Sequence, residues 1–353
     1  MNPSTTYSKA QVTRRLLPWY TRAKRDLPWR DNPSPYEVWV SEIMLQQTRV
    51  DTVVDRYREF LARFPTMRAL ANATVDDVLA AWSGLGYYRR ARSLHAGVQH
   101  VLEQHGGRFP HTVQEALRLP GIGLYTAGAI LSIAYNLPVP AVDGNVERVV
   151  SRLLAWRGDF RKASQAGRLR DTVETWIPKD ASSFNQSLME LGATTCTPRS
   201  PRCTSCPLST LCVAHREGNA ESYPETVRRQ KVVPVTLHAA ILHRGSELLL
   251  ERVEQSPFLK GMWLFPFSED PTTLLDRLGK SLGVPCTLTR SLGTVRHAIT
   301  FRKITLEAHV VTCGKKTPPR IAEPLRWTRP EEFGHEVAVS SLAFKILKLL
   351  PQG

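Results

Sequence analysis

The chain has 353 residues, of which 42% are hydrophobic, and it carries a formal net charge of +15. At about 100–200 residues per domain, this length predicts two or three domains with ordinary packed cores. Only two of the six cysteines lie outside one short run, the first fifteen residues lack a signal-peptide core, and no apolar run approaches a membrane span. These features exclude the secreted and membrane-spanning classes and predict a soluble protein of a reducing cytosol, with no membrane partner.

Positive charge is spread along the whole sequence. Residues 1–225 hold 28 Lys and Arg against 21 Asp and Glu, and residues 226–353 hold 19 against 11. A polyanion such as nucleic acid is the natural partner, because each cation that neutralises a phosphate releases a counterion. Arginine outnumbers lysine 35 to 12, so compositional bias stays open as another explanation of the charge.

Helical signals fill the first 215 residues. Ser34, Pro35 and Glu37 form a capping box with proline at the first helical position, which predicts a helix from Pro35 towards Arg49. Amphipathic segments separated by Gly or Pro predict further helices over 53–64, 75–82, 91–104, 113–119, 124–136, 146–156, 166–176 and 184–191. The first part of the chain is therefore predicted to be almost all-α.

Strand signals dominate the last part. A polar, charged stretch at 217–230 predicts a linker. Alternating hydrophobicity then predicts strands over 235–239, 247–252, 287–292, 302–311 and 325–328, with helices over 272–282 and 341–350. The pattern predicts an α+β unit of about 120 residues.

Four cysteines at 196, 203, 206 and 212 form a C-x6-C-x2-C-x5-C run. Zinc sites usually combine two C-x2-C pairs about 12–20 residues apart, whereas here one such pair stands between two longer gaps. A cubane iron–sulfur cluster with four thiolate corners fits this spacing better than one small ion. Zinc and four unrelated thiols stay open as alternatives.

A glycine-rich turn, Leu119-Pro120-Gly121-Ile122-Gly123, joins two predicted helices. Glycine allows a sharp turn and leaves N–H groups free at the start of the next helix, where a phosphate can be held without side-chain charge. The pattern indicates a helix–hairpin–helix, although a simple glycine-rich helix turn has the same composition.

Two carboxylates stand in positions suited to acid–base catalysis. Glu42 has the apolar helical neighbours Val38, Trp39 and Leu45, and burial there would keep its carboxyl protonated, as a general acid requires. Asp143 stands at a helix start, two residues before Asn145, which could orient either carboxyl group. A solvated helical Glu and an ordinary helix-capping Asp are the alternatives.

These motifs together resemble the MutY-type adenine DNA glycosylases of the endonuclease III superfamily. The resemblance rests on the cysteine run, the hairpin and four further segments: Leu27-Pro28-Trp29-Arg30, Val40 to Thr48, Trp82 to Tyr88, and Val142 to Val146. It implies an all-α helix–hairpin–helix glycosylase domain with a [4Fe–4S] cluster loop, followed by an α+β Nudix-like domain. It also implies a hydrolase that removes adenine mispaired with 8-oxoguanine or guanine in double-stranded DNA.

The resemblance implies a role for each matching position. Glu42 would protonate adenine at N7, Asp143 would stabilise the oxocarbenium-like sugar, and Asn145 would hold the carboxylates. Arg30 and Glu190 would line the adenine pocket, and Gln47 and Tyr87 would wedge the gap left by the flipped base. Thr48, Gly121 and Gly123 would lie against DNA, and Cys196, Cys203, Cys206 and Cys212 would hold the cluster.

Tyr125 separates two subtypes of the superfamily. Endonuclease III-type enzymes carry a lysine just after the hairpin, whose amine forms a Schiff base and cuts the strand. A phenol cannot form an imine, so Tyr125 predicts a monofunctional glycosylase. A bifunctional glycosylase and lyase acting on pyrimidine lesions stays as the alternative, as does a non-catalytic iron–sulfur protein that binds DNA.

The second domain resembles the Nudix-like module of the same family, with Gly261 to Pro266 as its anchor. Its helix over 272–282 offers only Asp276, whereas a magnesium pyrophosphatase needs several carboxylates. The module is therefore interpreted as the reader of the oxidised guanine. Thr300, between Ile299 and Phe301, would take the place of a family serine at that lesion.

The domain boundaries follow from these patterns. Residues 1–216 are expected to form the glycosylase domain with its hairpin at 119–123 and cluster loop at 196–212. Residues 217–232 are expected to link it to the Nudix-like domain at 233–353. The whole is expected to act as a monomer in a bacterial cytoplasm, associated with the nucleoid.

Overall fold

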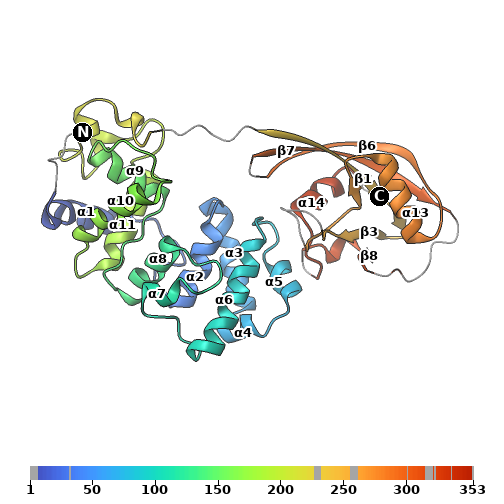
Figure 1. Ribbon diagram of the computed structural model, residues 1–353, viewed down its shortest axis with the longest axis horizontal. Coiled ribbons are helices and arrows are strands. Elements are labelled where there is room, and N and C mark those ends of the chain that lie inside the picture. The colour runs from blue at the N-terminus through green and yellow to red at the C-terminus, as the bar shows by residue number, and fades with distance from the viewer. Residues whose placement is uncertain are drawn as a thin grey trace. The chain divides into compact units, whose positions relative to one another are not determined.

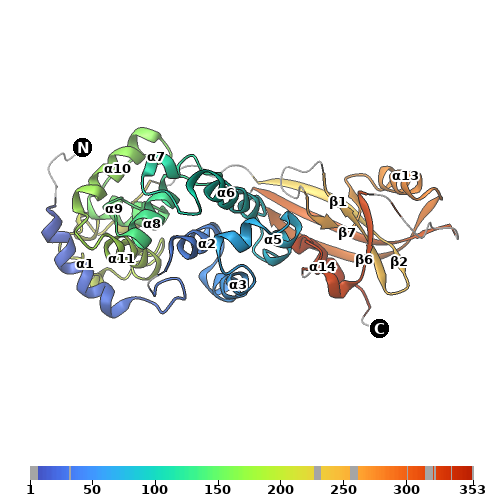
Figure 2. The same ribbon diagram turned by 90° about the horizontal axis from the view of Figure 1, so that it is seen from below.

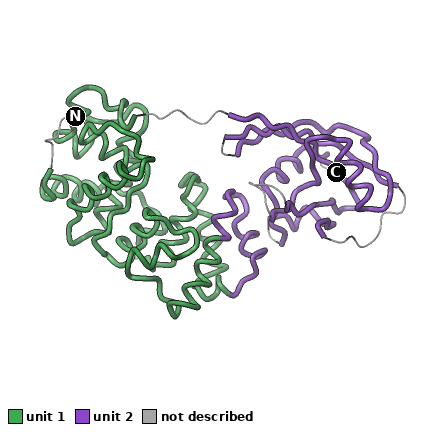
Figure 3. Tube along the Cα trace, viewed as in Figure 1, with its two compact units in different colours: residues 1–71, 93–228 green, residues 72–92, 229–353 purple. Residues whose placement is uncertain are grey.

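The computed structural model describes residues 7–31, 33–225, 232–254, 261–299, 301–314, 321, 323–334 and 336–351. Contacts within the chain define two compact units (Figure 3). The first unit holds residues 1–71 and 93–228, and the second holds residues 72–92 and 229–353. Among the described residues, each helix is too short or too polar to span a bilayer.

Helices make up the regular structure of the first unit among its described residues. They are α1 Lys9–Ala23, α2 Pro35–Leu45, α3 Val50–Arg63, α4 Met67–Ala71, α6 Arg89–His105 (which starts in the second unit), α7 Val113–Ala116, α8 Leu124–Tyr135, α9 Gly144–Leu153, α10 Ala163–Trp176, α11 Ala181–Thr194 and α12 Val213–Arg216. The predicted all-α character is confirmed. Helix α2 starts as expected, because Ser34 accepts from the Glu37 N–H and the Glu37 side chain accepts from the Ser34 N–H.

One group of helices, α1, α9, α10 and α11, packs around a shared core (Figure 2). Val12 and Leu16 of α1 share that core with Val149 and Leu188. Helix α1 was not among the predicted helices, although Ser8 and Gln11 form a capping box and the buried Val12, Leu16 and Tyr20 follow the helical spacing. That pattern would have predicted the helix.

A second group is built around α2, which lies between α3 and α8 (Figure 1). Helix α2 is buried along almost its whole length, including Trp39, Val40 and Met44. Such a helix needs apolar neighbours on several sides, and α3 and α8, which both contact α2, carry buried residues such as Tyr57 and Ile130. The side chains of α2 are therefore held in fixed positions.

The second unit contains the strands. They are β1 Val233–Ile241, β2 His243–Arg244, β3 Glu247–Arg252, β4 Trp263–Leu264, β5 Phe267–Ser268, β6 Cys286–Ile299, β7 Arg302–Cys313 and β8 Leu325–Thr328. One sheet has the order β5-β1-β7-β6, in which β1 and β7 run parallel and the other pairs run antiparallel. In the other sheet β3 pairs with β2, β4 and β8.

Two helices cover opposite faces of the sheet that contains β1. Leu237, Ala239 and Ile241 share a core with α14 Ser341–Leu347, whereas Ala240 and Leu242 share another with α13 Pro271–Leu282. The alternation follows from the two-residue period of a strand. The structure thus confirms the predicted α+β architecture of this region.

Residues 72–92 belong to this second unit and include α5 Val75–Ala81. Tyr88 Oη donates to the Val339 carbonyl at 3.1 Å, and Arg252 Nη2 lies 3.2 Å from Asp76 Oδ1.

Cys286 and Cys313, paired in register across β6 and β7, form a disulfide that was not predicted from the sequence.

Candidate active site

A cavity of about 660 Å³ opens in the first unit, between the two groups of helices. Its walls come from the loop over 25–30, α2 and the turn after it, the hairpin with α8, the start of α9, and α11. The sequence-predicted residues that line it are Arg30, Glu42, Gln47, Thr48, Gly121, Gly123, Tyr125, Asp143, Asn145 and Glu190. Segments far apart in the sequence thus converge on one space.

Glu42 projects from the buried helix α2 and is only 5% exposed. Burial raises the pKa of Glu42 to about 7, and the nearby Asp143 charge adds to this, while a hydrogen bond from Tyr125 works against it. Tyr125 Oη donates to Glu42 Oε2. Burial and the two carboxylates hold the pKa of Tyr125 well above its usual range, so the phenol is neutral and keeps its proton for Glu42.

Asp143 caps helix α9 and is held by three hydrogen bonds. Its Oδ1 accepts from the backbone N–H of Asn145 at 2.9 Å and of Val146 at 2.8 Å, and its Oδ2 accepts from Asn145 Nδ2 at 2.7 Å. Burial raises the pKa of Asp143, and these hydrogen bonds oppose that rise because they favour the ionised form. The predicted helix start is confirmed, and the cap also faces the cavity.

Arg148, which the sequence analysis missed, connects this pair to the cysteine loop. Its Nη2 donates to Asn145 Oδ1 and to the Gly192 carbonyl, each at 2.8 Å, and its Nε donates to the Cys196 carbonyl at 2.8 Å. Arg148 lies one helical turn beyond Gly144 on α9, so the spacing alone could have placed it near Asn145. Its link to Cys196 depends on the packing of α9 against α11.

Glu190 lies on α11 with its side chain fully buried and accepts from two guanidinium groups. Arg30 Nη2 donates to Oε2 at 2.6 Å, while Arg25 donates from Nε to Oε1 at 2.8 Å and from Nη2 to Oε2 at 2.9 Å. Burial raises the pKa of Glu190, but these hydrogen bonds outweigh it and hold the pKa below its usual range. Arg25 was not predicted, because nothing in the local sequence indicates its partner.

Cys196, Cys203, Cys206 and Cys212 are free thiols gathered after α11. Burial, together with negative charge on the other three sulfurs, raises the pKa of Cys206 to about 12. Four crowded thiolates therefore need positive charge at their centre, and a cluster of iron ions supplies it. The buried Arg152 holds the loop further by donating to the carbonyls of Thr197 at 2.7 Å and Pro198 at 3.0 Å. The donor set fits a [4Fe–4S] cluster.

The hairpin before α8 has the predicted glycine turn. Gly121 has φ +79°, and a side chain there would meet Ser93 Cβ at 2.6 Å, so only glycine fits without displacing α6. Gly123 precedes the first residue of α8 and has no side-chain cap, which leaves N–H groups at the helix start for another acceptor.

Gln47 and Tyr87, both predicted to wedge DNA, share an unusual backbone. Their φ angles are +58° and +47°, in the left-handed region that non-glycine residues rarely adopt. Gln47 lines the cavity, whereas Tyr87 belongs to the second unit and is 38% exposed. Thr300 lies outside the described residues.

Family comparison identifies the class of protein. Residues 40–178 match the HhH-GPD superfamily of base excision DNA repair proteins, residues 196–212 the iron–sulfur binding domain of endonuclease III, and residues 238–349 the NUDIX domain. The fold and the cavity therefore define a helix–hairpin–helix DNA glycosylase with an iron–sulfur loop and a Nudix-like module.

Similarity to individual proteins identifies the family within this class. The chain is 33% identical to the adenine DNA glycosylase of Homo sapiens. The alignment, 398 residues long with its gaps, covers 95% of this chain and 73% of the human protein. A thermostable thymine-DNA glycosylase has a TM-score of 0.54 at 27% identity, over 59% of this chain and 97% of its own. A trapped covalent endonuclease III–DNA complex has a TM-score of 0.51 at 25% identity, and the match covers 60% of this chain and 99% of that chain. The chain belongs to the adenine DNA glycosylase family.

Family membership confirms several predictions. The protein is a hydrolase that binds DNA and excises adenine in base excision repair, and it carries a [4Fe–4S] cluster at the cysteine loop. The predicted fold class is confirmed as well.

Proposed function

We propose that this chain flips adenine out of duplex DNA opposite 8-oxoguanine or guanine and excises it without cutting the strand. The supporting observation is that one cavity holds both Glu42, with a pKa near 7, and the hydrogen-bonded carboxylate Asp143. Its volume of about 660 Å³ suits a small ligand such as an extruded nucleoside. Flipping costs a few kcal/mol, which contacts inside the cavity would offset.

Glu42 acts as the general acid. At neutral pH a carboxyl with a pKa of about 7 is protonated in roughly half of the molecules, and it can take up a proton again after each turnover. Its proton goes to N7 of adenine, so the bond between C1′ and N9 breaks with the electron pair on a neutral base. Tyr125 orients Glu42 Oε2 through its hydrogen bond.

Asp143 stabilises the positive charge that develops on the sugar. Its three hydrogen bonds fix both oxygens and favour the anionic form. This is the two-carboxylate arrangement of glycosidic cleavage applied to a nucleoside. Water then adds to C1′ and leaves an abasic site, with Asn145 holding Asp143 in place throughout.

Arg30 and Glu190 line the adenine side of the cavity. Because Arg25 and Arg30 both donate to Glu190, its carboxylate is fixed before a base enters, which lowers the entropy cost of binding. When bound, the cluster would hold the loop at 196–212 rigid, and through Arg148 that loop supports Asn145.

The DNA itself is held by backbone groups and two strained residues. Gly121 and Gly123 offer N–H groups to a phosphate, and Thr48 lines the same cavity. Strained backbone concentrates at functional sites, and Gln47 and Tyr87 both show it, which supports their role as wedges in the base stack.

Tyr125 makes the enzyme monofunctional, because it stands where a lyase would need an amine. Its phenol stays neutral and bonded to Glu42, so it offers no nucleophile for C1′. Incubation with substrate duplex and borohydride should leave the protein free of DNA, and efficient cross-linking would exclude the proposal.

The Nudix-like module reads the base opposite adenine. Of the acidic residues that a pyrophosphatase helix requires, α13 carries only Asp276, so a binding role is left for the module. Thr300→Ala should reduce the preference for 8-oxoguanine over guanine and leave excision opposite guanine unchanged. An unaltered ratio would remove Thr300 from lesion reading.

Strand breakage after alkali tests the whole proposal. Duplexes carrying adenine opposite 8-oxoguanine, guanine, cytosine and thymine should break at adenine in the first two cases and far more slowly in the others. Equal breakage opposite thymine would contradict the proposed specificity.

A further inference from the structure

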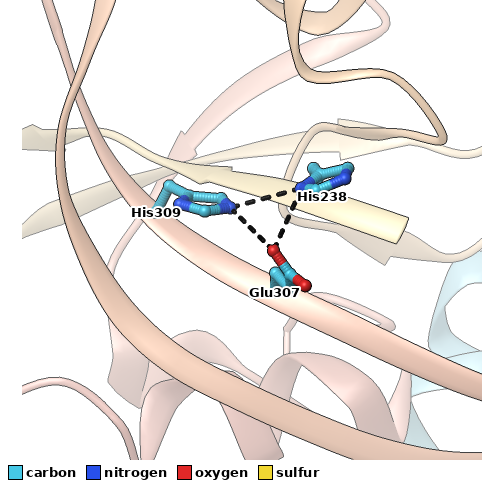
Figure 4. A group of neighbouring side chains, drawn as sticks. All are labelled: His238, Glu307 and His309. Carbon is cyan, nitrogen blue, oxygen red and sulfur yellow. Dashed lines mark hydrogen bonds and ion pairs between the residues drawn. The ribbon is translucent and has the colours of Figure 1, made fainter. Parts of the chain in front are cut away.

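Three side chains of the second unit gather on one face of the sheet that contains β1 and β7. His238 lies on β1, and Glu307 and His309 lie on the neighbouring strand β7. His238 and Glu307 are paired in register, and His309 follows two residues later on the same face. Figure 4 shows both rings and the carboxylate pointing toward one another.

Three atoms of this group form a compact triangle. His238 Nδ1 lies 3.3 Å from His309 Nε2 and 3.5 Å from Glu307 Oε2, while His309 Nε2 lies 3.8 Å from the same oxygen (Figure 4). Tetrahedral zinc holds nitrogen and oxygen ligands at about 2.0–2.2 Å, which places the ligands about 3.3–3.5 Å from one another. The observed triangle needs only small side-chain movements to match.

The surroundings also suit a metal ion. The two imidazoles are mostly buried, with side chains 18% and 17% exposed, whereas the Glu307 side chain is 42% exposed. Packed imidazoles are already oriented, so little side-chain entropy is lost on binding, and the open carboxylate side gives an ion a path of entry.

A hydrogen bond between the two histidines is the simpler explanation of their contact. It requires a proton on one nitrogen and a lone pair on the other, and it accounts for the 3.3 Å separation. It does not require a carboxylate oxygen near both nitrogens, whereas two imidazoles and one carboxylate are a known ligand set of zinc.

We propose that His238, Glu307 and His309 bind one divalent first-row transition metal ion, and that this ion is zinc. Two imidazoles and one carboxylate are a ligand set that zinc accepts, with a fourth position left for water. The ion would bridge the parallel strands β1 and β7 and stabilise the Nudix-like module. This site is separate from the four cysteines and from the helical magnesium site of Nudix hydrolases, and it does not depend on the proposed mispair specificity.

Metal analysis of the cluster-loaded full-length protein tests the site. The protein is stripped with EDTA, dialysed against buffered free zinc, and analysed for zinc and iron together. We expect one zinc per chain while the iron content stays unchanged. His309→Ala and the isosteric Glu307→Gln should each weaken zinc binding more than about tenfold, because even groups that only orient a ligand contribute about 10–100-fold.

His243→Ala is the matched control, since His243 is an exposed histidine of β2 in the same unit. It should bind zinc like the unaltered protein. Zinc should also raise the midpoint of thermal unfolding in the unaltered protein and in His243→Ala, but not in His309→Ala. Far-UV circular dichroism without zinc verifies that each variant is folded.

Three results would overturn the proposal. Zinc could fail to bind, it could bind equally well to Glu307→Gln and His309→Ala, or it could enter only as iron is lost. The last result would place the metal on the cysteine thiols.

Discussion

The guanidinium of Arg148 donates a hydrogen bond of 2.8 Å to the side-chain oxygen of Asn145. The same group donates to the backbone carbonyl of Cys196, the first cysteine of the cluster loop. Asn145 in turn donates to Asp143. A loop with no catalytic side chain is thereby connected to a carboxylate in the cavity through two residues.

Removal of this connection should slow excision. In Arg148→Ala, Asn145 loses the partner that fixes its amide, so Asp143 is held less well and the single-turnover rate constant should fall about 10–100-fold, as when a group that orients a ligand is lost. Iron content and absorbance should show that the cluster remains. Arg161→Ala, at an exposed arginine paired with Asp159, is the control and should leave the rate unchanged. An unchanged rate in Arg148→Ala would show that Asn145 needs no such support.

Glu42→Gln should abolish most turnover while the protein still binds the mispair. The amide keeps the shape of the side chain but cannot protonate N7, and loss of a general acid typically costs about 10²–10⁴-fold. Single-turnover kinetics and gel-shift binding measure the two effects separately. Glu59→Gln, at an exposed residue paired with Arg56, serves as the control. If Glu42→Gln lost affinity and kept its rate, the acid role would be wrong.

The rate of excision should depend on pH through both carboxyl groups. The rate should fall as pH rises through about 7, because Glu42 then loses its proton. It should also fall in acid, beginning above the usual range of an aspartate, because burial raises the pKa of Asp143 and protonation removes its charge. Tyr125→Phe removes a hydrogen bond that lowers the pKa of Glu42, so the alkaline limb should move to higher pH. A shift to lower pH would contradict the assigned role of Tyr125.

Glu42 should also reduce the stability of the protein at alkaline pH. Its folded pKa of about 7 lies above the unfolded value of 4.5, so its stabilising contribution is complete below the unfolded pKa and is lost as pH rises through 7. Glu42→Gln should therefore raise the free energy of unfolding at pH 8 by on the order of 1–3 kcal/mol. Thermal unfolding at pH 8 and pH 5 checks this, since the difference should shrink at pH 5. An equal difference at both values would exclude ionisation as the cause.

Gly192 allows α11 to approach α9 at Asn145. A side chain at Gly192 would meet Asn145 Cβ at 2.5 Å and its backbone oxygen at 2.9 Å, so the helices would have to separate. Gly192→Ala should destabilise the fold by about 1–3 kcal/mol and slow excision, because Asn145 and Arg148 would both move. Gly167→Ala on α10 is the control. Its nearest neighbour would be the flexible Arg170 side chain at 3.8 Å, so stability should be unchanged or slightly higher. Equal effects of the two substitutions would show that the close approach is unimportant.

Local patterns were sufficient for much of the fold. The capping box at Ser34 started α2, the glycine turn at Gly121 formed the hairpin, and the spacing from Cys196 to Cys212 predicted the cluster loop. Each of these features depends on residues close together in the chain, whose geometry the backbone restricts directly. The predicted cavity residues also converge, but that convergence depends on the packing of helices that are far apart in the sequence.

The amino-acid sequence by itself determined the classes of element and the glycosylase family, and it predicted Glu42 and Asp143 as the acid and the anion. Only the tertiary structure decided that Arg25 fixes Glu190, that Arg148 joins Asn145 to Cys196, and that His238 meets His309 across two parallel strands. Each of these contacts except the one from Arg148 to Asn145 joins residues tens of positions apart. No local propensity encodes such contacts, because they form only when the burial of apolar surface brings whole helices and strands together.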